Sequence, residues 1–279
     1  SISSAAEKGA KSLVLGFANS GGFLEAKWVP FIIEAIENGL DIISGLHQKL
    51  SSYPEIVAAA EKHQVNLHDI RHPESTFKTG TGVKRSGKRI LTVGTDCSVG
   101  KMYSSLALEK EMHAQGLSAT FRATGQCGIL IAGQGVAIDC VVSDFIAGAA
   151  EQISPENKAE HWDIVEGQGS LSHPAFAGVS LGLLHGSQPD ALVICHALNR
   201  SHMRGLPHTD FPSLEETIKL NLQAAKLTNP DVKVAGITVN TSSVSEEEGT
   251  KICTQLSETL GLPCVDPVRH GTASIVANL

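Results

Sequence analysis

Short apolar runs alternate with helical patterns along the first quarter of the chain. The apolar runs cover residues 12–16, 41–47 and 65–70, and apolar residues at helical spacing lie between them at 27–38 and 54–63. Strands that alternate with helices in this way predict a parallel sheet with helices on its faces. The chain begins without methionine, in the end of a helical pattern, so we expect a trimmed start that lacks a first strand.

A longer pattern of the same kind begins with an apolar strand at Arg89. Further apolar runs are found at residues 119–124, 162–166, 191–196, 234–240 and 264–266. Helical patterns lie between and after them, at residues 100–115, 136–151, 213–227, 245–261 and 272–278. Ser213 and Ser245 each open a Ser-x-x-Glu capping box, which marks a helix start. Residues 125–128 and 197–212 are predicted to be loops.

A polar, basic and glycine-rich segment separates the two patterns. Such composition is typical of a boundary between domains, so the segment is predicted to be a linker. The predicted organisation is an α/β domain at residues 1–75, a linker at 76–88 and a second α/β domain at 89–279.

Composition excludes several classes of protein. The net charge of −7 argues against a nucleic-acid binder, because there is no excess of Lys and Arg to neutralise phosphates. The six cysteines form no Cys-x-x-Cys pair, which favours reduced thiols in a cytoplasmic protein over a disulfide framework or a zinc site. Neither a secretory signal nor an apolar run of about 18 residues is present. We therefore expect a cytoplasmic protein without a membrane or nucleic-acid partner.

The strongest chemical signal is the stretch Gly94-Thr-Asp-Cys-Ser-Val-Gly-Lys101, which follows the strand at Arg89 and opens a helix. In such a loop, backbone N–H groups at the helix start and a lysine ammonium converge on an anion. A plain glycine turn between strand and helix is the alternative. The predicted phosphate-binding residues are Gly94, Thr95, Ser98, Val99, Gly100, Lys101 and Met102.

The loop departs from a standard phosphate loop at two positions. Thr95 stands where the first glycine is usual, and Met102 stands where a serine or threonine hydroxyl binds Mg²⁺. We therefore expect the loop to hold phosphates without a metal ion.

Polar residues gather at the ends of the other predicted strands, where ligands bind in an open α/β sheet. Glu166 ends a buried run and is a candidate general base or metal ligand; a carboxylate satisfied by turn N–H groups is the alternative. His173 and His202 lie on the same predicted face, with a structural role as the alternative for each.

Three arginines, Arg122, Arg200 and Arg204, are candidates for binding carboxylates, because a guanidinium matches a carboxylate in a bidentate geometry. Solvated surface arginines are the alternative. Asn240, at another strand end, is a candidate for contacting an adenine edge, against a turn-forming asparagine.

The phosphate loop resembles that of the dethiobiotin synthetases, including its early glycine. Val165-Glu-Gly-Gln-Gly169 also resembles their acidic strand-end motif. This resemblance implies a P-loop fold for residues 88–279. The chain departs from these synthetases at Met102, where they need a hydroxyl for Mg²⁺.

A second resemblance covers nearly the whole chain and is to the D-glutamate N-acetyltransferase family, long catalogued as a domain of unknown function. It rests on motifs that recur in order: Gly94-Thr-Asp-Cys-Ser-Val-Gly-Lys-Met102, Thr124-Gly-Gln-Cys-Gly-Ile129, Gly135-Val-Ala-Ile-Asp139, Val165-Glu-Gly-Gln-Gly-Ser-Leu171 with His173-Pro174, and Leu181-Gly-Leu-Leu-His-Gly186 with Pro189-Asp190. It implies a Rossmann-like first domain before the P-loop domain.

This second resemblance also implies acetyl-CoA as donor and D-glutamate as acceptor. The phosphates of coenzyme A are then expected on the loop, with Asn240 as a further contact. Glu166, His173 or His202 is expected to take the proton from the amine, and turn N–H groups at 167–169 to serve the oxyanion. A homo-oligomer is expected. The residues expected to bind the acceptor are Arg122, Gln126, Arg200 and Arg204.

Two other functions stay open from the sequence. One is an ATP-dependent ligase or kinase of the dethiobiotin synthetase type, against which Met102 counts. The other is a non-catalytic nucleotide-binding regulator, against which Glu166 and the Arg/His-rich stretch 197–212 count. An NAD-linked epimerase is disfavoured, because no Gly-x-Gly-x-x-Gly follows a strand.

Overall fold

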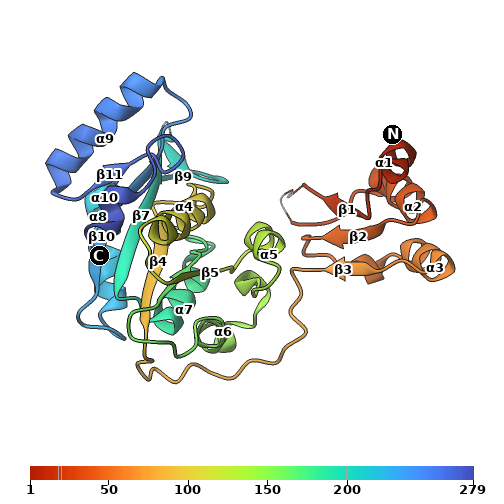
Figure 1. Ribbon diagram of the computed structural model, residues 1–279, viewed down its shortest axis with the longest axis horizontal. Coiled ribbons are helices and arrows are strands. Elements are labelled where there is room, and N and C mark those ends of the chain that lie inside the picture. The colour runs from red at the N-terminus through yellow and green to blue at the C-terminus, as the bar shows by residue number, and fades with distance from the viewer. Residues whose placement is uncertain (18, 20, 199) are drawn as a thin grey trace.

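The computed structural model describes residues 1–17, 19, 21–198 and 200–279, and it consists of two α/β units joined by an extended segment (Figure 1). The first unit contains a three-stranded parallel sheet in the order β1-β2-β3. Its elements are α1 (Ile2–Glu7), β1 (Ser12–Leu15), α2 (Val29–Glu37), β2 (Asp41–Ser44), α3 (Pro54–His63) and β3 (Leu67–Asp69). The predicted parallel α/β architecture of this part is confirmed.

The second unit is built on a six-stranded parallel sheet in the order β11-β10-β7-β4-β6-β5. Its strands are β4 (Lys88–Gly94), β5 (Ala119–Arg122), β6 (Trp162–Val165), β7 (Ala191–Ala197), β10 (Lys233–Asn240) and β11 (Cys264–Val265). Its helices are α4 (Lys101–Ala114), α5 (Gln126–Ala132), α6 (Ile146–Ile153), α7 (Ala177–Ser187), α8 (Leu214–Ala225), α9 (Glu246–Leu260) and α10 (Ala273–Val276). The predicted α/β fold is confirmed here too.

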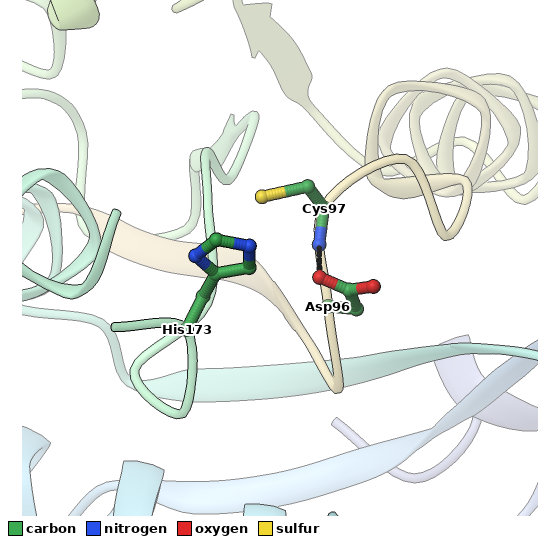
Figure 2. Close-up of side chains that lie close together, drawn as sticks. All are labelled: Asp96, Cys97 and His173. Carbon is green, nitrogen blue, oxygen red and sulfur yellow. Dashed lines mark hydrogen bonds between the residues drawn. The ribbon is translucent and has the colours of Figure 1, made fainter. Parts of the chain in front are cut away.

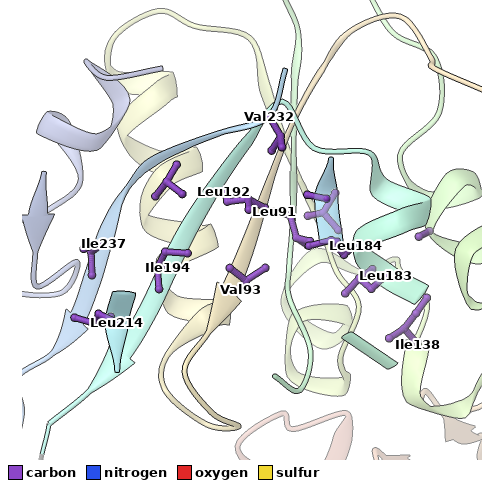
Figure 3. Packing of buried hydrophobic residues seen from close by; sticks show 14 of the residues in the cluster. Leu91, Val93, Ile138, Leu183, Leu184, Leu192, Ile194, Leu214, Val232 and Ile237 are labelled. Carbon is purple, nitrogen blue, oxygen red and sulfur yellow. The ribbon is translucent and has the colours of Figure 1, made fainter. Parts of the chain in front are cut away.

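Both faces of the large sheet are buried, as expected when helices cover a parallel sheet on its two sides. On one face Leu91 and Ile194 pack with Leu184 of α7 (Figure 3). On the other face Ile90 packs with Leu108 of α4. The first unit has a separate apolar core of its own, with members from both its sheet and its helices: Leu15, Ile32, Ile36, Ile42 and Ile56.

The predicted helix at 136–151 is wrong in its first half. The structure has two short 3-10 turns there, Ile138–Cys140 and Ser143–Phe145, before α6 begins. The backbone of this segment is instead paired with the end of β5, because Val136 N–H donates to Ala123 O and Ile138 N–H donates to Thr124 O. These hydrogen bonds hold the segment beside the end of β5, so it cannot form the predicted α-helix.

The structure also differs from the sequence prediction in two loops, in one helix and at one helix start. The predicted loop at 197–212 contains a small antiparallel hairpin, β8 (His202–Met203) and β9 (Leu206–Asp210). Most of the predicted loop at 125–128 is the first turn of α5, and α7 was not predicted. The capping box at Ser213 is confirmed on both sides, whereas Ser245 shows one side of its box, in which its hydroxyl accepts from Glu248 N–H.

The segment at 76–88 lies along α6 and α7 of the second unit. The N–H groups of Thr81 and Gly82 donate to the Glu151 carboxylate at 2.8 and 3.1 Å. Arg85 donates to the carbonyls of Ser154 and Gly186 at 2.9 and 2.8 Å. The segment is therefore attached to the P-loop unit through its backbone and its arginine. In the described part of the chain, no helix has the length and apolar character needed to cross a membrane.

Candidate active site

The phosphate loop lies at the carboxyl end of β4, the central strand that pairs with β6 and β7. β4 ends at Gly94, and α4 begins at Lys101. Between them, Ser98 and Gly100 have positive φ angles of 53° and 105°. Alternation of this kind turns successive N–H groups toward one concave side, which makes a nest for an anion.

A buried carboxylate braces this loop. Asp96 accepts from Cys97 N–H at 2.6 Å, and its second oxygen accepts from Arg200 Nη1 at 2.9 Å and from Arg204 N–H at 2.8 Å. Arg200 also donates to the carbonyls of Cys97 and Ser98, each at 2.7 Å. Arg200 was predicted to bind a carboxylate of the substrate. In the structure its guanidinium binds the loop itself and stabilises the nest.

Lys101 and Met102 follow the nest at the start of α4. Lys101 is buried and its Nζ donates to Asp96 O at 2.9 Å; burial lowers the pKa of its ammonium. An incoming anion would offer this ammonium a stronger acceptor than a carbonyl oxygen. Met102 packs against the apolar cluster that contains Phe121 and Ile129, so a thioether stands where a metal-binding hydroxyl would be needed.

Two cavities flank the loop. Cavity A has a volume of about 440 Å³, and among its lining residues are Gly100, Lys101, Met102, Gln126, Glu166 and Asn240. Cavity B has a volume of about 370 Å³, and among its lining residues are Val99, Gly100, Asn240, Pro267, Val268 and Arg269. Both cavities are lined by Gly100 and Asn240, so they adjoin each other beside the phosphate nest. An elongated ligand with phosphates in its middle suits this pair of cavities.

Glu166 directly follows β6 and faces cavity A. Only 4% of the residue is exposed, and its Oε2 accepts from the N–H groups of Thr124 and Gly125 at 2.9 and 3.1 Å. Burial raises the pKa of this carboxyl to about 7, although these two N–H groups and Lys101 act in the opposite direction. A carboxyl with this pKa exchanges protons near neutrality, as a general base must.

The next residue, Gly167, is held against the loop strand. Its N–H donates to Thr92 Oγ1 at 2.9 Å, and a Cβ at this position would lie 1.6 Å from Thr92 O. Only glycine allows β6 to end this close to β4. The sequence predicted the N–H groups at 167–169 as oxyanion donors. In the structure the Gly167 N–H already donates to Thr92 Oγ1.

Comparison with known proteins identifies the family. Residues 1–73 match the model of a domain of unknown function described as a Rossmann-like domain (DUF1611_N), and residues 76–276 match that of a P-loop domain (DUF1611_C). This chain belongs to the DUF1611 family. A crystal structure of a DUF1611 family protein from Anabaena variabilis is 33% identical with a TM-score of 0.92, and the match covers 100% of this chain and 82% of that one.

Two curated relatives of this DUF1611 protein carry the name D-glutamate N-acetyltransferase. The one from Pseudoalteromonas sp is 70% identical over 279 residues, which are 100% of this chain and 84% of that protein. The one from Tritonibacter scottomollicae is 50% identical over 268 residues, which are 96% of this chain and 80% of that protein. The resemblance inferred from the motifs is therefore confirmed.

The DUF1611 protein also brings Asp96, Cys97 and His173 together, with one ligand-type atom of each within 4.8 Å of the others (Figure 2). His173 Nε2 lies 3.0 Å from Arg204 O, and its Nδ1 accepts from Ala175 N–H at 3.2 Å. Both ring nitrogens are thus engaged, with the proton on Nε2, and both Asp96 oxygens accept bonds of their own. Burial raises the pKa of the Cys97 thiol, so this cluster offers neither a free imidazole lone pair nor a thiolate.

The remaining predicted residues fall in different places. Arg122 pairs with buried Asp163 at 2.7 Å and lines a separate cavity of about 260 Å³. His202 is exposed on β8, where its Nδ1 lies 3.1 Å from Ser201 Oγ, and it does not line cavity A or B. Asn240 lines both cavities while its Oδ1 accepts from Ser242 N–H at 3.0 Å, so it also makes the turn that was the alternative. The predicted site residues that line cavity A together with Glu166 are Ser98, Gly100, Lys101, Met102, Gln126 and Asn240.

Sequence reasoning missed Arg71, which reaches cavity A from the first unit of the DUF1611 protein. Its Nε donates to Gly45 O at 2.6 Å, and its Nη1 makes a short ion pair with Asp139 of the second unit. No local pattern marks this arginine, because its partners lie 26 and 68 positions away along the chain. The sequence signals near this contact were Gln126 and Asp139, the last residue of the motif Gly135-Val-Ala-Ile-Asp139.

Proposed function

We propose that this protein is a D-glutamate N-acetyltransferase that uses acetyl-CoA as its donor. The names of its two curated relatives support the reaction and the acceptor. The observation that carries the proposal is the presence of buried Glu166 and the phosphate-loop lysine, Lys101, in one cavity. A carrier held by its phosphates can thereby present its reactive end to a carboxyl group that titrates near neutrality.

The residues around the loop suit the parts of coenzyme A. The nest between Gly94 and Lys101 and the lysine ammonium would hold the pyrophosphate. Cavity B, with Val99, Val268 and Arg269 among its lining residues, would take the adenosine, and cavity A would take the acyl arm. Met102 takes the place of the hydroxyl that follows the lysine in a standard phosphate loop and binds Mg²⁺, which suits a pyrophosphate that is bound and not cleaved.

Acetyl-CoA supplies a thioester whose acetyl carbon is attacked by the amine of D-glutamate. The ionised Glu166 takes a proton from the ammonium group, which gives the nitrogen a free electron pair. The new C–N bond forms and the C–S bond breaks, and the proton held by Glu166 goes to the departing sulfur. The carboxylate freed in this way takes the second proton that the nitrogen loses when it becomes an amide, and that proton passes to solvent. The products are N-acetyl-D-glutamate and coenzyme A with a free thiol.

A thiol-release assay tests this proposal. The purified protein is mixed with acetyl-CoA and either D-glutamate or L-glutamate, free thiol is followed with a chromogenic disulfide, and the product is identified by mass spectrometry. We expect thiol release that depends on D-glutamate. ATP with Mg²⁺ is the comparison substrate, and ATP hydrolysis without thiol release would overturn the transferase in favour of a ligase or kinase.

A further inference from the structure

A third cavity lies between the two units, in addition to the two cavities that flank the phosphate loop. Cavity C has a volume of about 340 Å³; the first unit lines it with Gly22, His47 and Arg71, and the second with Cys97, Gln126 and Arg204, among others. Among the described residues that line this cavity there are two arginines and no aspartate or glutamate. In a chain with a net charge of −7, such a cavity is a local site for an anion.

Arg71 is held so that one edge of its guanidinium stays available. Nε is fixed by Gly45 O at 2.6 Å, and Nη1 by Asp139 and by His47 Nε2, the latter at 3.3 Å. The hydrogen bonds of the described residues to this guanidinium use Nε and Nη1, and the Cys140 thiol also lies beside it. A guanidinium fixed on two sides loses little further entropy when its free edge binds a carboxylate.

Arg204 belongs to the second unit, and buried side chains bind its backbone at both the N–H and the carbonyl group. Its N–H donates to Asp96 at 2.8 Å, and its carbonyl lies 3.0 Å from His173 Nε2. Its exposed side chain, which lines cavity C, makes a short hydrogen bond to the hydroxyl of Ser98. Asp96 and His173 thus fix the position from which the Arg204 side chain extends.

Cavity C adjoins cavity A, which holds Glu166, because Arg71 and Gln126 line both cavities. A ligand held by acidic groups in cavity C can therefore direct its amine toward Glu166 in cavity A. Two guanidinium groups in one cavity, one from each unit, match a short molecule with a carboxylate at each end.

Building on the proposed transferase activity, we propose that cavity C is the acceptor site, in which Arg71 and Arg204 each bind one carboxylate of D-glutamate. In this arrangement the first unit contributes Arg71 to the acceptor site, and the second unit binds the donor. Selection of a dicarboxylic amino acid over a monocarboxylic one follows from the pair of arginines, since an acceptor with one carboxylate leaves one guanidinium unpaired.

Steady-state kinetics of Arg71→Gln and Arg204→Gln test the site. Each change removes a charged hydrogen bond, so the KM for D-glutamate is expected to rise roughly 10- to 100-fold. The KM for acetyl-CoA should change much less, because Lys101 and the N–H groups of the nest are kept. Lys226→Gln removes one positive charge from the exposed end of α8, outside cavities A, B and C, and should change neither constant. The preference for D-glutamate over D-glutamine should fall in both arginine variants. An unchanged KM for D-glutamate in either arginine variant would overturn the site.

Two further measurements separate this site from the other claims. If Arg71→Gln melts below the assay temperature, Arg71→Lys takes its place, because it keeps the charge and loses the planar fork; the same rise in KM is expected. If the wild-type protein releases no thiol, the transferase proposal fails, and calorimetric titration of D-glutamate in the presence of coenzyme A then tests cavity C alone. Binding that is lost in both arginine variants supports the site, and absence of binding to the wild type overturns it.

Discussion

At the scale of single residues, Glu166 shows how a fold sets the chemistry of a carboxyl group. Its burial at the end of β6 disfavours the charge, while Thr124 and Gly125 donate N–H groups to it from the neighbouring strand end. The two effects leave the pKa at about 7, well above the usual value of 4.5. Both protonation states are accordingly accessible during turnover near neutral pH.

This pKa predicts the pH dependence of the reaction. Only the ionised carboxylate accepts a proton, so kcat/KM for D-glutamate should rise with pH through a midpoint at about 7. In Glu166→Gln this acidic limb should vanish and kcat should fall by roughly 10²- to 10⁴-fold, the usual contribution of a general base. The measurement is a pH–rate profile of both proteins, with acetyl-CoA affinity by calorimetry as the control. A variant profile that keeps the same acidic midpoint would show that another group is the base.

The sequence could identify Glu166 but not Arg71, and the reason is physical. A charge that ends an apolar run is conspicuous along the chain, because a buried strand excludes unneeded charges. Arg71 and Arg200 obtain their roles from partners that are distant in sequence: Asp139 for the first, and Asp96, 104 positions away, for the second. Only the tertiary structure brings such partners together.

At the scale of elements, α7 is a helix that the sequence pattern did not predict, because of its glycines. Glycine disfavours helix, and the pattern of α7 has no clear polar face. The structure explains Gly186, because a Cβ there would lie 2.1 Å from Ala147 O of α6. This glycine is therefore required for the close approach of two helices, while strands such as β4 and β7 were predictable from their continuous apolar runs.

Two alanine substitutions within α7 measure this requirement. Gly186→Ala should lower the free energy of unfolding by about 1–3 kcal/mol, because the added methyl group collides with backbone that cannot move freely. Gly178→Ala is the matched control: in the described structure no atom lies within 4 Å of its added Cβ. There alanine should be neutral or stabilise by up to about 1 kcal/mol through its helix propensity. Urea unfolding of both variants gives the comparison, and equal stabilities would contradict the packing argument.

At the scale of the whole molecule, each unit has an apolar core, and the two meet through polar groups and through Ile70, which packs against the cluster of Phe121 and Ile129. The core of the first unit is formed by residues of that unit alone. The contacts across the interface include the pair of Arg71 with Asp139, and His47 Nδ1 at 3.6 Å from Cys140 Sγ. The sequence predicted two α/β units from the repeated strand–helix pattern, but it gave no indication of the cavity between them, because cavity C requires residues from both.

This division predicts that donor binding and acetyl transfer can be separated by cutting the chain. A fragment of residues 76–279 keeps the sheet, the phosphate loop and the segment that bonds to Glu151 and Ser154. It should therefore unfold cooperatively and bind acetyl-CoA like the full chain, since cavity B and the loop belong wholly to it. It lacks Arg71 and the wall of cavity C that the first unit supplies, so thiol release with D-glutamate should be lost. Calorimetry and the thiol assay on the fragment, beside the full chain, give both readings. A folded fragment that still acetylates D-glutamate with unchanged KM would place the acceptor entirely within the second unit, because no part of the first would then be needed to hold its carboxylates.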